Sequence, residues 1–137
     1  MEERAHRQTR QKRDIRAVLA ESSDFVGAQE LHRRLKERGS GIGLATVYRT
    51  LNDLVEHAQA DVFTGTQGQM FRLCASEGHH HHLVCVECGR TVEVDAPIEG
   101  WVDAVAADHG FTRVRHVLDI MGVCADCARR LDTESDG

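Results

Sequence analysis

Aromatic residues are few in this sequence, and long apolar runs are missing. Its 137 residues include only four Phe, one Tyr and one Trp for building cores. No window approaches the roughly 18 apolar residues of a membrane span, and the charged first residues have no apolar run behind them, so we expect a cytoplasmic protein without a membrane partner. The patterns His-x-Glu and His-Glu-x-x-His are also missing, which argues against a zinc hydrolase or deaminase. We therefore expect neither enzymatic activity nor a small-molecule substrate.

The net charge of −5 is unevenly distributed along the chain. Residues 1–60 carry a charge of +2, whereas residues 61–137 carry −7. A polyanionic partner would therefore have to bind the first half. Six basic residues lie between Arg4 and Arg16, and they could form a phosphate-binding face or simply a solvated helix end. Charge alone favours the second interpretation.

Hydrophobic periodicity predicts three helices and a hairpin in the first half. The predicted helices cover residues 10–20 with Thr9 as N-cap, residues 28–38 between Gly27 and Gly39, and residues 44–58. The β-prone runs DVF and MFRL, separated by TGTQGQ, then form the hairpin. This order is typical of a winged helix, a helix-turn-helix variant whose third helix enters the major groove.

The third predicted helix carries a polar face opposite its apolar stripe. Arg49 on this face could read guanine edges, and Thr46 and Tyr48 could hold phosphates. Any amphipathic surface helix has a polar face, so these residues alone do not establish a function. The helix order and the basic tract together favour binding to double-stranded DNA.

The second half predicts a small α/β unit. HHLVCVECGRTVEV indicates two strands, residues 97–110 a helix, FTRVRHVLDIMGVC a third strand, and residues 132–137 a disordered polar tail. The predicted fold class is therefore α+β, with an N-terminal winged helix-turn-helix domain and a small C-terminal α/β domain. We place the first domain at residues 1–76, a hinge at 77–82 and the second domain at 83–137.

Four of the five cysteines form two Cys-x-x-Cys pairs. Disulfides are disfavoured in a cytosolic chain, and such pairs typically hold zinc in a tetrahedron of thiolates. Because four sulfurs leave no open position, we expect a structural zinc site that offsets a small core. A disulfide or a thiol switch is the alternative. The four residues are Cys85, Cys88, Cys124 and Cys127.

The run of four histidines, residues 79–82, suits two metal ions better than one. In an extended strand successive side chains point to opposite faces, so His80 and His82 would face one way and His79 and His81 the other. Further ligands must come from elsewhere, and the sequence alone does not say which pair takes which. The candidates are Asp61 and Cys74 in the first domain, and Glu99 and His116 in the second.

Less specific explanations exist for these residues. The run could be a tag remnant, although tags lie at termini, or a solvated loop that binds metal nonspecifically. His116 on an apolar face could be a satisfied core histidine, and Glu99 in a first helical turn could be explained by the helix dipole.

Four motifs together resemble the ferric uptake regulator family. They are GLATVYRTLNDL, then C-x4-HHHHLVC-x2-CG, then HGF, and a final C-x2-C. The resemblance extends from about Arg7 to Cys127 and is strongest to the zinc-sensing branch of actinobacterial type. It implies a homodimeric repressor that binds inverted-repeat operators of zinc-uptake genes when loaded with zinc.

The resemblance also implies roles for individual residues and two to three zinc ions per chain. It assigns the four paired cysteines to structural zinc and Thr46, Tyr48 and Arg49 to DNA. The regulatory zinc site at the hinge would comprise Asp61, Cys74, His80 and His82, and a third site His79, His81, Glu99 and His116. One thiolate with harder ligands favours zinc. Sensing of iron, manganese, nickel or peroxide remains an alternative, as does a zinc-storing or interaction protein without DNA binding.

Overall fold

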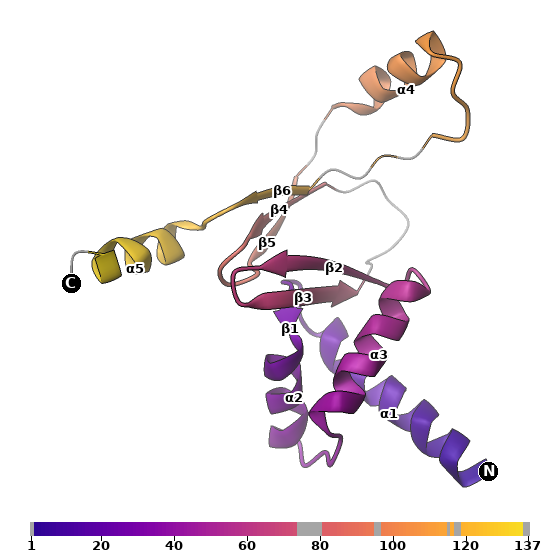
Figure 1. The fold of residues 1–137 in the computed structure, drawn as a ribbon, viewed down its shortest axis with the longest axis vertical. Coiled ribbons are helices and arrows are strands. Elements are labelled where there is room, and N and C mark those ends of the chain that lie inside the picture. The colour runs from indigo at the N-terminus through magenta and orange to yellow at the C-terminus, as the bar shows by residue number, and fades with distance from the viewer. Residues whose placement is uncertain (1, 74–80, 95–96, 115, 117–118, 136–137) are drawn as a thin grey trace.

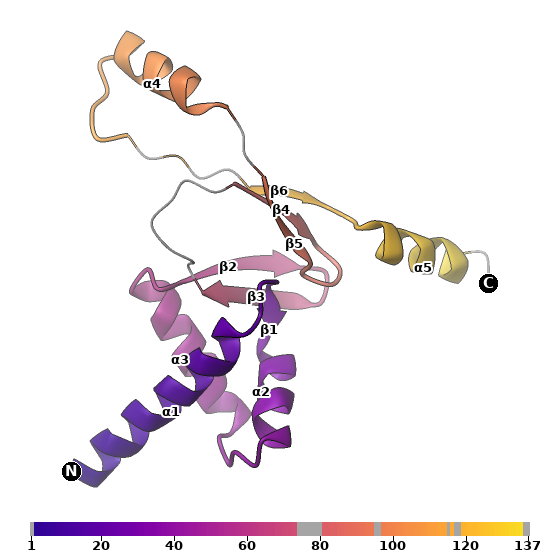
Figure 2. The ribbon, with the colours of Figure 1, turned by 180° about the vertical axis from the view of Figure 1, so that it is seen from behind.

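The chain folds into a three-helix unit capped by one small sheet, followed by a second small sheet with two outlying helices (Figures 1 and 2). The computed structural model describes residues 2–73, 81–94, 97–114, 116 and 119–135, with side chains from residue 6 onward. The helices are α1 (Glu2–Ala20), α2 (Ala28–Glu37), α3 (Leu44–Glu56), α4 (Glu99–Asp108) and α5 (Ala125–Ser135). The strands are β1 (Val26–Gly27), β2 (Ala60–Gly65), β3 (Gly68–Leu73), β4 (His81–Cys85), β5 (Thr91–Val94) and β6 (Asp119–Gly122).

The first unit is a winged helix with a continuous core. Its antiparallel sheet has the order β1-β3-β2, and the β2–β3 hairpin is the predicted wing. Phe71 on the central strand is fully buried and lies opposite Val26 and Val62. Helix side chains at 3.6-residue spacing complete this core, among them Ile15, Leu19, Leu31, Leu35, Val47, Leu51 and Leu54.

Helices α2 and α3 begin where the sequence predicts. Gly27 and Gly43 are their N-caps, both in extended conformation and without a side-chain cap hydrogen bond. Val26 and Leu31 flank the start of α2 and are both buried, as expected of a hydrophobic staple. Gly39 follows α2 with φ of +82°, a left-handed conformation that glycine adopts readily.

Helix α1 begins eight residues earlier than predicted. It starts at Glu2, so Thr9 lies inside the helix and the prediction that it is an N-cap is wrong. The segment before Thr9 is rich in Ala, Arg, Gln and Glu and contains neither Gly nor Pro. These residues have high helix propensity, and one Thr costs only a fraction of a kcal/mol. The basic tract is therefore helical along its whole length.

The second sheet has the order β5-β4-β6, with β4 antiparallel to β5 and parallel to β6. The third strand is shorter than predicted and covers only Asp119–Gly122. Helix α4 lies away from the sheet at the end of a long excursion (Figure 1). The prediction of a disordered tail is wrong up to Ser135, because α5 continues from the last cysteine pair to that residue. Residues 136–137 lie outside the described ranges.

The two units contact each other through backbone hydrogen bonds. The N–H of Phe25 donates to the carbonyl of Gly89 at 2.9 Å, and the N–H of Thr66 donates to that of Val86 at 3.0 Å. The loop before β1 and the wing turn therefore rest on the β4–β5 turn. Most of the predicted hinge lies outside the described ranges, so the domain boundaries stay a prediction. No helix in the described part of the chain is long and apolar enough to span a bilayer.

Candidate metal centres and nucleic-acid interface

The two Cys-x-x-Cys pairs meet at one end of the second sheet. Cys85 ends β4, Cys88 lies in the following turn, and the other two cysteines lie at the start of α5. The parallel pairing of β6 with β4 sets Gly122 opposite Cys85, which delivers Cys124 to the first pair. The backbone N–H of Cys124 donates to Cys85 Sγ at 3.3 Å. Pairing of β4 with β6 thus brings the two cysteine pairs together, although 35 residues separate them in the sequence.

The geometry of the four sulfurs fits a tetrahedral ion. All four Sγ atoms lie within 4.8 Å of one another, and those of Cys88 and Cys124 are 3.9 Å apart. A tetrahedron with bonds of about 2.3 Å has edges of about 3.8 Å. Among the described residues, this is the only group of three or more potential ligands this close together. A zinc ion would require only a slight contraction.

The electrostatics of the cluster also favour a bound cation. Burial opposes ionisation of the Cys85 thiol, but backbone N–H groups, first that of Cys124, lower its pKa to about 6. The pKa of Cys127 is raised to about 12, chiefly by its hydrogen bond with the Cys124 thiol. The Cys85 thiolate therefore forms readily, whereas the raised pKa of Cys127 opposes a second negative charge beside it. A divalent cation among the sulfurs would remove that resistance.

His81 and His82, neighbours on β4, have different surroundings, as expected of successive strand residues. His81 is only 3% exposed, and its ring lies 5.2 Å from that of His116 between centroids. No described residue hydrogen-bonds to the buried Nε2 of His81. A buried polar atom of this kind is costly unless it has a partner, and an imidazole nitrogen is a good zinc ligand. These two histidines therefore fit a metal site.

The structure does not bring Glu99 to these two histidines. It is exposed at the first position of α4, and within the described ranges the three residues form no ligand group. Three other predicted ligands, Cys74, His79 and His80, lie outside the described residues. Both predicted histidine sites are therefore described only in part.

His82 lies between the two units and contacts a residue that the sequence analysis overlooked. Arg72 Nη1 donates to His82 Nε2 at 2.9 Å, and the His82 side chain is only 15% exposed. His82 Nδ1 lies 3.5 Å from the Asp119 carboxylate. Asp61 is exposed on β2, directly opposite Arg72 in the hairpin. Alternation in MFRL could have placed Arg72 on the face of Asp61, but no local signal predicts its contact with His82.

The predicted DNA-binding residues lie on the outer side of α3. Tyr48 and Arg49 are exposed and Thr46 is half-buried, whereas Val47 and Leu51 on the opposite side are fully buried. Arg49 Nη2 donates to Thr46 Oγ1 at 3.2 Å, which holds the guanidinium along the helix surface. These side chains are therefore accessible to a ligand without disturbing the core.

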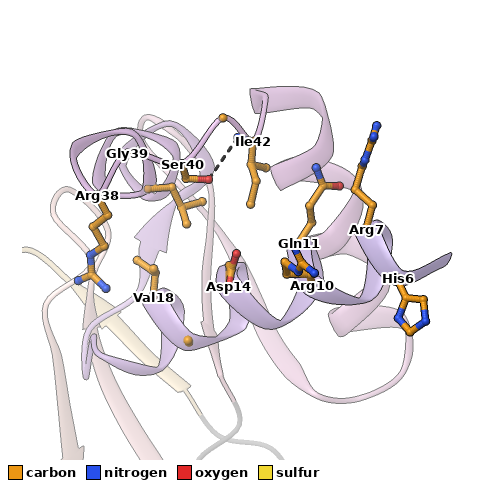
Figure 3. A pocket seen from close by; sticks show the side chains of 13 residues that line it. His6, Arg7, Arg10, Gln11, Asp14, Val18, Arg38, Gly39, Ser40 and Ile42 are labelled. Atoms are coloured by element: carbon orange, nitrogen blue, oxygen red, sulfur yellow. Dashed lines mark hydrogen bonds between the residues drawn. The ribbon is translucent and has the colours of Figure 1, made fainter. Parts of the chain in front are cut away.

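A groove between α1 and the α2–α3 loop is lined by basic side chains (Figure 3). Arg7 and Arg10 extend from α1, and Arg38 comes from the end of α2, where it forms an ion pair with Glu21. The loop is held by a hydrogen bond from the N–H of Ile42 to Ser40 Oγ at 3.2 Å. Two residues of the basic tract, Arg7 and Arg10, therefore line a concave surface of the winged helix that could take phosphates.

An ion pair fixes α1 relative to α3. Lys12 Nζ donates to the carboxylate of Asp53 at 2.7 Å, and this hydrogen bond lowers the pKa of Asp53. Both side chains are substantially exposed, so their contribution to stability is small. The pair connects α1 to α3 at the surface of the winged helix.

The fold and the cysteine cluster define a class: a winged helix-turn-helix protein with a small α/β domain whose four cysteine sulfurs could hold a metal ion. The ferric uptake regulator family model matches residues 3–121. The chain belongs to the ferric uptake regulator family, whose members are regulators of transcription and not enzymes.

Individual relatives agree with this assignment. The chain is 48% identical over 123 residues to the zinc uptake regulation protein of Mycobacterium tuberculosis, covering 88% of this chain and 94% of that protein. The crystal structure of FurB, a zinc uptake regulator from M. tuberculosis, has 45% identity and a TM-score of 0.58, with 93% and 99% of the two chains covered. The Vibrio cholerae ferric uptake regulator has 32% identity and a TM-score of 0.68, with 82% and 88% covered.

Proposed function

We propose that this protein is a zinc-responsive transcriptional repressor that binds inverted-repeat operators of zinc-uptake genes as a zinc-loaded homodimer. The observation that carries the proposal is the position of His82, a potential zinc ligand at the contact between the winged helix and the second sheet. The 48% identity to a zinc uptake regulation protein supports zinc as the metal. A ligand at this junction can convert metal status into the orientation of a DNA-binding domain.

We assign the four paired cysteines to a structural zinc ion, because their sulfurs form a closed tetrahedral set. The regulatory site comprises Asp61, Cys74, His80 and His82. The third site, with His79, His81, Glu99 and His116, is supported by the proximity of two of its histidines. Each chain would then hold two to three zinc ions, and bound zinc would supply a cross-link between donors from the two units.

Apolar side chains exposed on the second unit support a homodimer. They include Leu83, Val92, Trp101, Phe111, Ile120 and Met121. Exposed apolar surface of this extent marks an interaction site. A symmetric dimer formed here would present two copies of α3 to successive major grooves of an inverted repeat.

Two substitutions separate base reading from phosphate binding. Arg49→Ala is expected to weaken operator binding about tenfold and to relax sequence preference, because it removes a side chain on the outer face of α3. Arg7→Ala is expected to weaken binding to any duplex by a similar or smaller factor. It should also lower the slope of log affinity against log salt concentration by about one, because about one fewer counterion is released on binding. Fluorescence anisotropy at several salt concentrations measures both effects. Arg129→Ala, on exposed α5, is the control and should change neither.

The function itself is tested by titrating zinc against DNA binding. The probe is the inverted-repeat duplex that the zinc-loaded protein selects from random DNA. Binding should tighten at least fivefold as free zinc rises to submicromolar levels, as expected of typical allosteric coupling. Cys74→Ser should abolish this response while the fold survives. If zinc leaves the affinity of the wild-type protein unchanged, the repressor assignment is wrong.

A further inference from the structure

Arg72 is the most deeply buried charged side chain at the junction of the two units. Its side chain is 8% exposed, although its charge cannot be removed by deprotonation. A buried guanidinium is costly unless its donors are satisfied. The contacts that satisfy it therefore identify what it holds in place.

Those contacts connect Arg72 on β3 to three other segments. Its Nε donates to the carbonyl oxygen of Ser23 at 2.7 Å, in the loop after α1. Its Nη1 donates to His82 Nε2 on β4 at 2.9 Å, and its Nη2 lies 3.5 Å from the carboxylate of Glu93 on β5. One side chain thus joins the winged helix to two strands of the second sheet.

The contact with His82 determines the state of that ring. Arginine can only donate, so Nε2 must present its lone pair, and the proton of the neutral ring is on Nδ1. Nδ1 faces the Asp119 carboxylate at 3.5 Å, and strand pairing sets Asp119 directly beside His82. A carboxylate on Nδ1 with the lone pair on Nε2 is the arrangement in which histidine ligates metals. Here the Arg72 guanidinium donates a hydrogen bond to the lone pair that a zinc ion would bind.

This inference rests on the proposed zinc-dependent function. We propose that Arg72 is a cationic latch, by which we mean that its guanidinium competes with zinc for the lone pair of His82 Nε2. One lone pair cannot accept the Arg72 donor and ligate zinc at the same time. In the metal-free regulatory site, Ser23 anchors Arg72 within the winged helix, and Arg72 contacts the second sheet through His82 and Glu93. When zinc binds His82 Nε2, it displaces Arg72 Nη1 and removes one of the three contacts of Arg72. Zinc binding therefore weakens the connection between the winged helix and the second sheet. Arg72 thereby raises the zinc concentration at which the regulator responds.

The inference is tested by measuring zinc affinity directly. Zinc binding to the regulatory site is followed by competition with a chromophoric chelator, using full-length protein with the cysteine cluster already loaded. Arg72→Met should bind zinc about 10- to 100-fold more tightly, because a charge-assisted hydrogen bond no longer competes. Glu93→Gln, which weakens only one anchor of the guanidinium, should give a smaller increase. Arg13→Met, at an exposed position of α1, is the matched control and should leave the affinity unchanged.

A second measurement does not depend on zinc. In the Arg72→Met variant with an empty regulatory site, hydrogen exchange in residues 20–27 should accelerate, because the Ser23 carbonyl loses its hydrogen-bond donor. In Arg13→Met the exchange of the same residues should stay slow. If Arg72→Met does not fold, the exposed Glu93→Gln substitution decides the matter by itself. Unchanged or weaker zinc binding in the folded variants would overturn the latch. That result would leave the proposed function intact as long as zinc tightens operator binding by the wild-type protein.

Discussion

Cys127→Ser is expected to unfold the second unit while the winged helix keeps its helices. Cys127 is buried at the start of α5, and its sulfur belongs to a set that joins β4, the following turn and α5. Structural zinc contributes about 10–16 kcal/mol in zinc-finger peptides, which matches or exceeds the whole stability of a typical domain. Among its described residues, the second unit has few buried apolar side chains, and Val84 is one of them. Without the ion, its strands lack enough core to stay paired.

Metal analysis and hydrogen exchange measure this outcome. The variant should lose one zinc ion per chain and the protection of β4, β5 and β6, whereas α1, α2 and α3 should stay protected. Cys74→Ser is the matched control, because Cys74 belongs to neither Cys-x-x-Cys pair, and it should retain both the ion and the protection. A Cys127→Ser protein that still holds this zinc and protects β4 would show that the cysteine cluster is not a structural zinc site.

Gly89→Ala is expected to destabilise the protein by about 2–5 kcal/mol and to separate the two units. Gly89 has φ of +82°, a conformation that costs other residues about 1–2 kcal/mol. A Cβ at this position would also lie 2.3 Å from the carbonyl oxygen of Phe25, a backbone atom that cannot rotate away. Overpacking of this kind typically costs 1–3 kcal/mol. The hydrogen bond from Phe25 to Gly89 would be lost with it.

Urea denaturation and exchange of the Phe25 amide measure this effect. Gly65→Ala tests the same interface from the wing, since its Cβ would lie 2.7 Å from the carbonyl oxygen of Val86. Gly100→Ala is the control: nothing lies within 4 Å of the added Cβ in α4, and alanine should be neutral or slightly stabilising there. Equal stability of Gly89→Ala and Gly100→Ala would contradict the observed contact between the units.

The predictions of α3 and of the cysteine group, which rest on local pattern, agree with the structure. The 3.6-residue spacing of Val47, Leu51 and Leu54 predicted both the extent of α3 and its buried side. The two Cys-x-x-Cys pairs predicted a group of four sulfurs because a tetrahedral zinc site takes four ligands and each pair supplies two. These features follow from short-range geometry, which the sequence contains directly.

Features that depend on distant contacts could not be predicted in the same way. Arg72 is 49 residues from Ser23 and 10 from His82, and nothing in the residues around it indicates that it is buried. Within the described residues the predicted third strand is shorter, because there it is Asp119–Gly122 that pairs with β4. The predicted disordered tail, residues 132–137, rests on polar composition alone, and α5 continues through that composition to Ser135. For Arg72 and β6, tertiary contacts rather than local propensity decide the structure.

Reciprocal coupling between zinc and operator DNA is the most direct test of this account. The zinc affinity of the regulatory site is measured by chelator competition with and without the selected inverted-repeat duplex. Linkage requires DNA to tighten zinc binding by the same factor by which zinc tightens DNA binding, and we expect roughly 5- to 150-fold for both. A zinc affinity that is the same with and without the operator would contradict the claim that zinc at the junction controls DNA binding.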